Sequence, residues 1–254
     1  MLDHLSYSSI SNYLACGEAW RRKYVANEPT FTTPALLFGS AIHNTVEEYV
    51  QDKSKNLLDL WSGHWNNQVN SEGLPRTDIL WGVETAEQHY NEGVRILSNE
   101  QVLYNLNTLT PLPENGIERK VELRVPGVPV PVIGYIDIIT SDGIPGDFKT
   151  SSKSWSSDRA AGEMQPLFYL AALNQAGVKV PEWRFRHFTI VKTKTPKFET
   201  FDTMHNPGEL FFLFQMIQRV WQAINASVYP INPTGWKCSQ QYCDFWANCR
   251  GRFQ

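Results

Sequence analysis

The fold is decided by two stretches in the middle of the chain, Gly134-Tyr135-Ile136-Asp137 and Gly146-Asp147-Phe148-Lys149-Thr150. Each lies in or beside an apolar run rich in isoleucine, which is typical of a buried strand. Asp147 and Lys149 are two residues apart, so their side chains leave the same face of that strand. The Ser141-Asp142-Gly143 turn between the stretches favours a hairpin that would bring Asp137 alongside them.

This arrangement of charges predicts a metal site. Two carboxylates can hold a hard cation such as Mg²⁺ or Mn²⁺ through oxygen. An adjacent ammonium group can orient a water and stabilise charge that develops on a phosphate. An Asp-X-Lys triplet alone is usually a solvated surface pair. Asp137, however, lies between Ile136 and Ile138, where a carboxylate is costly to bury without a partner.

The sequence on either side of these strands alternates between helical and strand periodicity. We expect strands over 117–125, 130–139, 144–149 and 183–191, and helices over 8–24, 36–50, 79–97, 160–175 and 206–228. The stretch between the second and third helices, rich in Trp and Gly, is predicted to be irregular or partly helical. This order predicts an α/β protein with a central mixed sheet flanked by helices, a helical N-terminal part and a Cys-rich C-terminal tail.

The composition is that of an ordinary globular protein, with 254 residues, 42% of them hydrophobic and 19% charged. No run approaches the roughly 18 apolar residues of a membrane span, and the first residues lack the pattern of a secretory signal. We therefore expect a cytoplasmic protein without membrane contact. The net charge of −3 argues against a generic basic nucleic-acid binder. It does not exclude a DNA substrate, because carboxylates that hold cations also lower the charge.

Two further motifs flank the acidic strands. Gly39-Ser40-Ala41-Ile42-His43 precedes them on a predicted helix, and Gln165-Pro166-Leu167-Phe168-Tyr169 follows them on another. Each of the four motifs is weak alone. In this order and at these separations, the chain resembles the RecB-type nucleases of the PD-(D/E)XK superfamily.

The resemblance implies a restriction-endonuclease-like core and a role for each matched residue. His43, Asp137, Asp147 and the backbone carbonyl of Phe148 would bind Mg²⁺ or Mn²⁺. Lys149 would be the catalytic lysine. Gln165 and Tyr169, one helical turn apart, would contact DNA or orient the catalytic groups.

The four cysteines predict a second site. Cys16 lies in the first predicted helix, whereas Cys238, Cys243 and Cys249 are clustered in the tail. Disulfides are rare in the cytosol, so a four-thiolate site fits best, holding either a [4Fe–4S] cluster or Zn²⁺. One remote and three clustered cysteines favour the iron–sulfur cluster, with structural zinc as the alternative.

The cysteine pattern extends the resemblance to the iron–sulfur-containing subset of the family. This subset includes the AddB nuclease domain and the CRISPR-adaptation exonucleases, and a phage-encoded origin is compatible with it. The gap of four residues between Cys238 and Cys243 departs from the usual two. We therefore expect a single nuclease domain over 1–254, in which 1–35 and 229–254 form a metal-cluster staple. The nuclease core would span 36–228, with a helical insertion at about 55–112.

The predicted function is that of a metal-dependent DNA exonuclease that hydrolyses phosphodiester bonds by a metal-activated water. Its substrate would be single-stranded DNA or DNA with free ends, in recombination, repair, or phage or CRISPR DNA processing. A basic loop could line the DNA path through Lys192, Lys194 and Lys197. One alternative is a catalytically silent DNA-binding or scaffold module. Another is an electron-transfer protein, which would leave the Asp137, Asp147 and Lys149 set unexplained.

Overall fold

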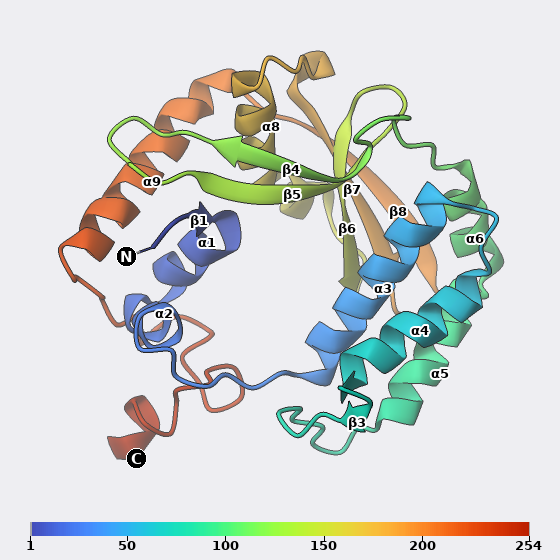
Figure 1. The fold of residues 1–254 in the computed structure, drawn as a ribbon, viewed down its shortest axis with the longest axis horizontal. Coiled ribbons are helices and arrows are strands. Elements are labelled where there is room, and N and C mark those ends of the chain that lie inside the picture. The colour runs from blue at the N-terminus through green and yellow to red at the C-terminus, as the bar shows by residue number, and fades with distance from the viewer. Residues whose placement is uncertain (1, 254) are drawn as a thin grey trace. The chain divides into compact units, whose positions relative to one another are not determined.

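The strands predicted around the two aspartates lie next to each other in a mixed sheet, as expected. A computed structural model, which describes residues 2–253, gives the strand order β1-β5-β6-β7-β8, and β4 also pairs with β5. The strands are β1 (Leu5–Ser6), β4 (Ile117–Leu123), β5 (Val132–Ile139), β6 (Pro145–Ser151), β7 (Arg184–Val191) and β8 (Lys197–Met204) (Figure 1). The β5–β6 pair is antiparallel, with Ile138 opposite Gly146. The β6–β7 pair is parallel, with Asp147 opposite His187.

The chain divides into two compact units, and each is assembled from separate stretches of sequence. The first unit contains the residues up to Phe31, Glu122–Gly134 and the residues from Pro207 onward. The second unit contains Thr32–Val121 and Tyr135–Asn206. All of the predicted residues of the acidic site are in the second unit, and all four cysteines are in the first.

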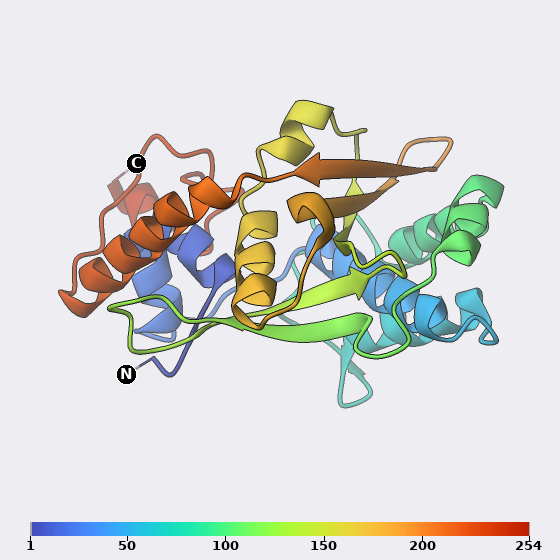
Figure 2. The same ribbon diagram turned by 90° about the horizontal axis from the view of Figure 1, so that it is seen from above.

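In the second unit, four helices form a layer that packs on one face of the sheet. They are α3 (Pro34–Gln51), α4 (Leu57–Val69), α5 (Ala86–Leu97) and α6 (Glu100–Thr108), grouped together in Figure 1 and Figure 2. Phe38 and Trp61 of this layer are fully buried and share a core with Phe148, Phe188 and Phe198 of the strands. Thr33 caps α3 by accepting from the N–H of Leu36, and Pro34 opens the first turn. The small hairpin β2 (Asn70–Ser71) and β3 (Leu74–Pro75) follows α4.

The opposite face of the sheet in this unit carries Asp147, Lys149 and the short helices α7 (Ser157–Ala161) and α8 (Gln165–Gln175). Strand side chains alternate between faces, so Phe188 points into the helical layer while Phe185 and His187 point the other way. Tyr169 of α8 stacks on Phe185, with ring centroids 5.9 Å apart. A single 3₁₀ turn (Pro181–Trp183) leads from this region into β7.

The first unit contains α1 (Tyr7–Ala15), α2 (Gly17–Tyr24), α9 (Leu210–Asn225) and two 3₁₀ turns, Pro207–Glu209 and Arg250–Phe253. Trp20 is 1% exposed and is the centre of its core. The indole donates to the hydroxyl of Ser9 and stacks on Tyr229 at 6.0 Å. The strand β1 pairs parallel with the start of β5, through Leu5 and Val132.

Several predicted boundaries were wrong. The helix expected over 8–24 is two helices, because the backbone of Cys16 is extended (φ −167°, ψ 111°). Cys16 is both the C-cap of α1 and the N-cap of α2. The helix expected over 160–175 is broken between Ala161 and Gln165, and the one expected over 79–97 begins only at Ala86. The strand β8 was not predicted at all. Its only two buried residues, Phe198 and Thr203, are five apart and therefore lie on opposite faces, so the strand lacks a regular alternation of buried and exposed residues.

Candidate active site

The acidic strands bring Asp137 and the main chain of β6 together. Asp137 is 4% exposed, and its Oδ2 accepts a hydrogen bond of 2.6 Å from the N–H of Phe148. The antiparallel register sets this contact, since Asp137 is one residue from Ile138, the partner of Gly146. A Cβ on Gly146 would lie 2.7 Å from the Phe188 ring, so a residue without a side chain is required for this close strand packing.

Helix α3 adds two more groups to the same place. His43 Nε2 lies 3.3 Å from Asp137 Oδ2 and 2.7 Å from Glu47 Oε1. Residues four apart on a helix are neighbours on its surface, so the side chains of His43 and Glu47 lie on the same face of α3. Glu47 is 6% exposed, although it carries a carboxyl group. A buried carboxyl beside a second buried carboxyl needs a compensating charge.

Glu118 of β4 completes this group. Its Oε1 is 4.0 Å from His43 Nε2, and one donor atom each from His43, Glu47, Glu118 and Asp137 lies within 4.8 Å of the others. Glu118 has a backbone φ of +47°, a left-handed conformation that is uncommon for a residue with a side chain. Strain of this kind concentrates at functional sites. One imidazole nitrogen and three carboxylate oxygens are a donor set that can hold a divalent cation.

The pKa values of Glu47 and His43 are both raised, which shows that negative charge is crowded at the place where a cation would bind. Burial raises the pKa of Glu47 to about 8, although hydrogen bonding to His43 opposes the shift. Burial lowers the pKa of His43, but hydrogen bonds to Asp137 and Glu47 outweigh it and raise that pKa to about 11. Protons are therefore retained where carboxylates crowd together. A bound divalent cation would displace them, including the proton on His43 Nε2.

Lys149 lies beside this group on the same strand as Asp147. Its Nζ is 2.6 Å from Asp147 Oδ2, which places both side chains on one face of β6. Burial lowers the pKa of Lys149, but the negative charge of Asp147 outweighs it and raises that pKa. Burial, and then repulsion from Asp137, raises the pKa of Asp147 to about 7. Lys149 is thus a cation held next to two buried carboxyl groups.

A chain of hydrogen bonds fixes the lysine from the opposite side. Lys149 Nζ donates to Gln165 Oε1 at 3.2 Å, and Gln165 Nε2 donates to the hydroxyl of Tyr169 at 2.9 Å. Helix α8 begins at Gln165, with a proline in its first turn, so the Gln and Tyr side chains share one helical edge. Burial raises the pKa of Tyr169 well above its usual range, so the hydroxyl stays protonated.

Tyr169 packs against a row of rings, the aromatic ladder, formed by Phe185, His187 and Trp155. Phe185 stacks on Tyr169, and the His187 ring lies 5.1 Å from Phe185 and 5.3 Å from Trp155. Arg159 closes the ladder at the surface, with its guanidinium carbon 4.2 Å from the centroid of the Trp155 ring. Burial, and then the charge of Lys149, lowers the pKa of His187 to about 4. The ladder therefore packs a neutral histidine against the strand that carries Asp147.

The sequence reasoning missed Glu47 and Glu118. Glu47 could have been found, because it follows His43 by four residues on a predicted helix. Glu118 had no comparable signal, since its position depends on a left-handed residue at the start of β4. Phe148 contacts the site through its N–H, which hydrogen-bonds to Asp137. Asp147 is engaged by Lys149 and is not part of the four-residue group.

The three lysines predicted to line a DNA path differ in their surroundings. Lys192 is held by the protein, with its Nζ 3.8 Å from Glu92 and 4.5 Å from the centroid of the Phe38 ring. Lys194 and Lys197 are exposed at the turn between β7 and β8. A role in DNA binding stays a prediction, and these two are its better candidates.

The four cysteines converge within the first unit and form no disulfide. Burial raises the pKa of the Cys243 thiol, and the charges of Cys16, Cys238 and Cys249 add to the shift. The tail is fastened to the N-terminal helices, since the Gly17 N–H donates to Pro230 O at 2.9 Å. A Cβ on Gly17 would lie 2.7 Å from Pro230 Cδ. This glycine next to Cys16 therefore allows the close approach.

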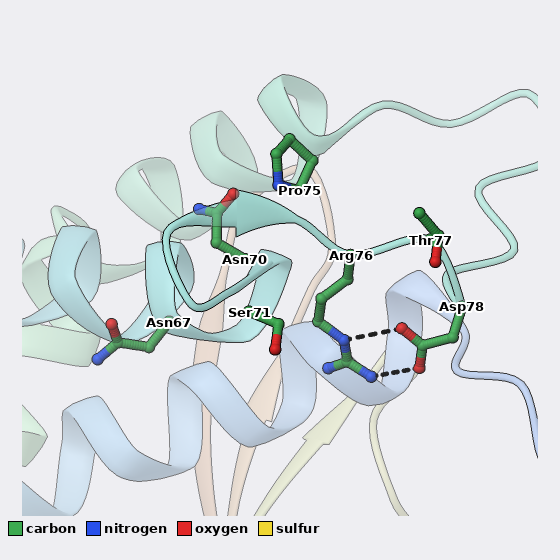
Figure 3. Close-up of a pocket in the computed structure, with 7 residues that line it drawn as sticks. All are labelled: Asn67, Asn70, Ser71, Pro75, Arg76, Thr77 and Asp78. Atoms are coloured by element: carbon green, nitrogen blue, oxygen red, sulfur yellow. Dashed lines mark hydrogen bonds and ion pairs between the residues drawn. The ribbon is translucent and has the colours of Figure 1, made fainter.

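A separate polar pocket lies beside the β2–β3 hairpin in the second unit and has a volume of about 580 Å³ (Figure 3). Its one basic residue, Arg76, is already paired with Asp78 through both nitrogens of a guanidinium fork. None of its seven lining residues belongs to the acidic group, so we assign the pocket no chemistry. The lining residues are Asn67, Asn70, Ser71, Pro75, Arg76, Thr77 and Asp78.

Comparison with known proteins identifies the family. The model of the PD-(D/E)XK nuclease superfamily matches residues 4–250, so the chain belongs to this superfamily and is a nuclease by family. The chain also resembles a crystal structure from Eubacterium rectale that is provisionally described as an exonuclease. The TM-score is 0.61 and the sequence identity 14%, over 98% of this chain and 88% of that one. At this identity, the likeness supports the fold.

A second solved structure, of the protein SSO0001, matches with 14% identity over 96% of this chain and 98% of that one. Its TM-score of 0.36 is too low to indicate a shared fold. No curated protein matches the sequence. Within residues 2–253, none of the helices combines the length and apolar character needed to cross a bilayer.

Proposed function

We propose that this protein is a metal-dependent deoxyribonuclease that removes nucleotides from free or single-stranded DNA ends. The proposal rests on two groups of residues that occur in the same unit. One is the group of His43, Glu47, Glu118 and Asp137, whose donor atoms lie within 4.8 Å of one another. The other is Lys149, held between Asp147 and Gln165.

The residues of the first group fit a Mg²⁺ or Mn²⁺ ion. Asp137 and His43 would bind it, and Glu47 and Glu118 would either bind it directly or hold its waters. Asp147 and the Phe148 main chain, which the family resemblance adds, lie on the neighbouring strand. Such an ion supplies an acidified water as nucleophile and stabilises negative charge on the phosphate.

The protein groups would position that reaction. Lys149 carries a fixed positive charge, because Asp147 keeps its pKa high. The ammonium can donate to the attacking water or to a phosphate oxygen on which charge develops. Gln165 and Tyr169 restrict the lysine to one orientation, so little reorganisation is needed when the phosphate arrives.

We further propose that the four cysteines hold a [4Fe–4S] cluster, as in the iron–sulfur subset of the family. One remote and three clustered cysteines, all in the first unit, support the cluster, and structural Zn²⁺ is the alternative. The biological setting that we propose is DNA recombination, repair, or phage or CRISPR DNA processing.

The test is degradation of DNA labelled separately at each end, with anaerobically purified protein and Mg²⁺ or Mn²⁺. The wild type is expected to degrade DNA only with the metal, and the label pattern gives the polarity. Lys149→Ala should lose at least about 100-fold in rate, since it removes the charge at the phosphate. Lys153→Ala is the matched control, because Lys153 lies just after β6 but is exposed. A folded, cluster-loaded wild type that is inactive on every DNA form would instead support a silent DNA-binding module.

A further inference from the structure

The C-terminal tail exposes two large aromatic rings that the rest of the first unit does not cover. Trp236 is 70% exposed and Tyr242 is 56% exposed. The rings pack edge to face with centroids 5.2 Å apart. The same tail buries Phe245 to 6% exposure. The tail is therefore able to bury an aromatic side chain, yet it leaves this pair in solvent.

The segment that carries the pair is held in place. The N–H of Gly235 donates to the side chain of Asn232, and the N–H of Cys238 donates to the carbonyl of Gly235. The N–H groups of Tyr242 and Cys243 both donate to the carbonyl of Ser239. These turns fix the backbone on both sides of the ring pair, so a ligand that stacks there meets a preformed surface.

One positive charge lies beside the rings, and two more lie on the same tail. Lys237 Nζ lies 5.6 Å from the centroid of the Trp236 ring. Arg250 donates to the carbonyl of Pro233 at 2.8 Å, which brings it to the turn just before Trp236. Arg252 is exposed on the same last turn. In the part of the chain that the structure describes, none of these three cations forms an ion pair with a carboxylate, and the only acidic residue after Tyr229 is Asp244.

We propose that Trp236 and Tyr242, with Lys237, Arg250 and Arg252, form a platform for single-stranded DNA. The rings would stack on unpaired bases and the cations would bind the phosphates between them. Exposed rings with nearby cations that have no carboxylate partner match the two parts of a single strand, flat bases and a charged backbone. A duplex hides the faces of its bases, so it would use only the charged part of the platform. The inference rests on the proposed function in taking DNA as the ligand.

The test separates stacking from charge. Binding of a labelled twelve-nucleotide single strand is measured by fluorescence anisotropy in EDTA, where no cleavage occurs, against an abasic strand of equal length and charge. The wild type should bind the strand with bases at least about tenfold more tightly. Trp236→Ala/Tyr242→Ala should bind both strands with the affinity that the wild type has for the abasic one. Trp236→Phe/Tyr242→Phe should restore the preference.

The matched control is Phe211→Ala/Phe212→Ala, which removes another exposed aromatic pair from the same unit, at 71% and 60% exposure. No Lys or Arg precedes Arg219 on that helix, so this variant should bind both strands as the wild type does. A preference that survives in Trp236→Ala/Tyr242→Ala, or no preference in the wild type, would overturn the platform. Cleavage with Mn²⁺ is measured separately. An inactive wild type that still shows ring-dependent binding would count against the nuclease proposal alone.

Discussion

The crowded carboxyl groups around His43 predict an unusual pH dependence of stability in the metal-free protein. In the folded state, Glu47 keeps its proton up to pH about 8, because burial raises its pKa. In the unfolded chain it loses that proton near the ordinary glutamate pKa of 4.5. The stability linked to this proton is therefore complete below pH about 4.5 and is lost as the pH rises through about 8.

The size of the effect follows from proton linkage. One extra proton bound by the folded state lowers the free energy of unfolding by about 1.4 kcal/mol per pH unit. Between pH 6 and 8, Glu47 alone thus contributes a loss of about 2–3 kcal/mol. The raised pKa of His43 acts in the same direction at pH values above the ordinary histidine pKa of 6.5. Stability should therefore fall steadily across this range.

The assay is urea unfolding in EDTA at pH 6, 7 and 8, followed by tryptophan fluorescence. Glu47→Gln keeps the shape of the side chain but cannot ionise. The free energy of unfolding of this variant should therefore fall less steeply with pH, by the amount that one proton contributes. Glu48→Gln is the control on the same helix. The pKa of Glu48 is lowered, first by its hydrogen bond to Lys55, so it stays ionised throughout. Added Mn²⁺ should stabilise the wild type more at pH 8 than at pH 6, because fewer protons compete for the ligands. A wild-type stability that is flat or rises from pH 6 to 8 in EDTA would refute this account.

Three further predictions concern other parts of the molecule. Gly17→Ala should destabilise the protein by about 1–3 kcal/mol in urea unfolding, because the new methyl group meets Pro230. Gly63→Ala on α4, with open space around it, should instead stabilise the protein by up to about 1 kcal/mol. If the two variants changed the free energy of unfolding equally, the proposed clash of Gly17→Ala with Pro230 would be wrong. Cys243→Ser should lower the bound iron and sulfide measured by chemical analysis, and unchanged iron would argue against thiolate ligation. Trp155→Ala should cost about 3 kcal/mol in urea unfolding by opening a cavity in the aromatic ladder, and a cost below about 1 kcal/mol would show that the ladder is not packed.

The mixed sheet and its flanking helices could be predicted because they depend on local patterns. Asp137 and Asp147 lie in or beside apolar runs that are typical of interior strands, and the Ser141–Gly143 turn favours their antiparallel pairing. The alternation of the β5 and β6 residues then fixes which side chains share a face. Lys149 beside Asp147 is a direct result of that period of two.

The features that escaped prediction depend on contacts between distant residues. The break at Cys16 lies next to Gly17, which weakens a helix but does not by itself end one, and it occurs where Gly17 meets Pro230. Glu118 reaches His43 through a left-handed backbone that its residue type does not favour. The strand β8 has no regular alternation of buried and exposed residues, so only its pairing with β7 identifies it. In each of these cases a contact between residues far apart in the sequence completes what the local pattern leaves open.

The fastening of the first helices to the tail has a consequence for biosynthesis. Tyr13 donates to the carbonyl of Val228, and Trp20 stacks on Tyr229, more than 200 residues later in the chain. At about 5–20 residues per second, roughly 10–40 s pass between the synthesis of the two partners. During this time the apolar faces of α1 and α2 lack their native cover on the ribosome. A chain that stops before residue 228 would keep them uncovered, so early termination would leave a ready target for chaperones and proteases.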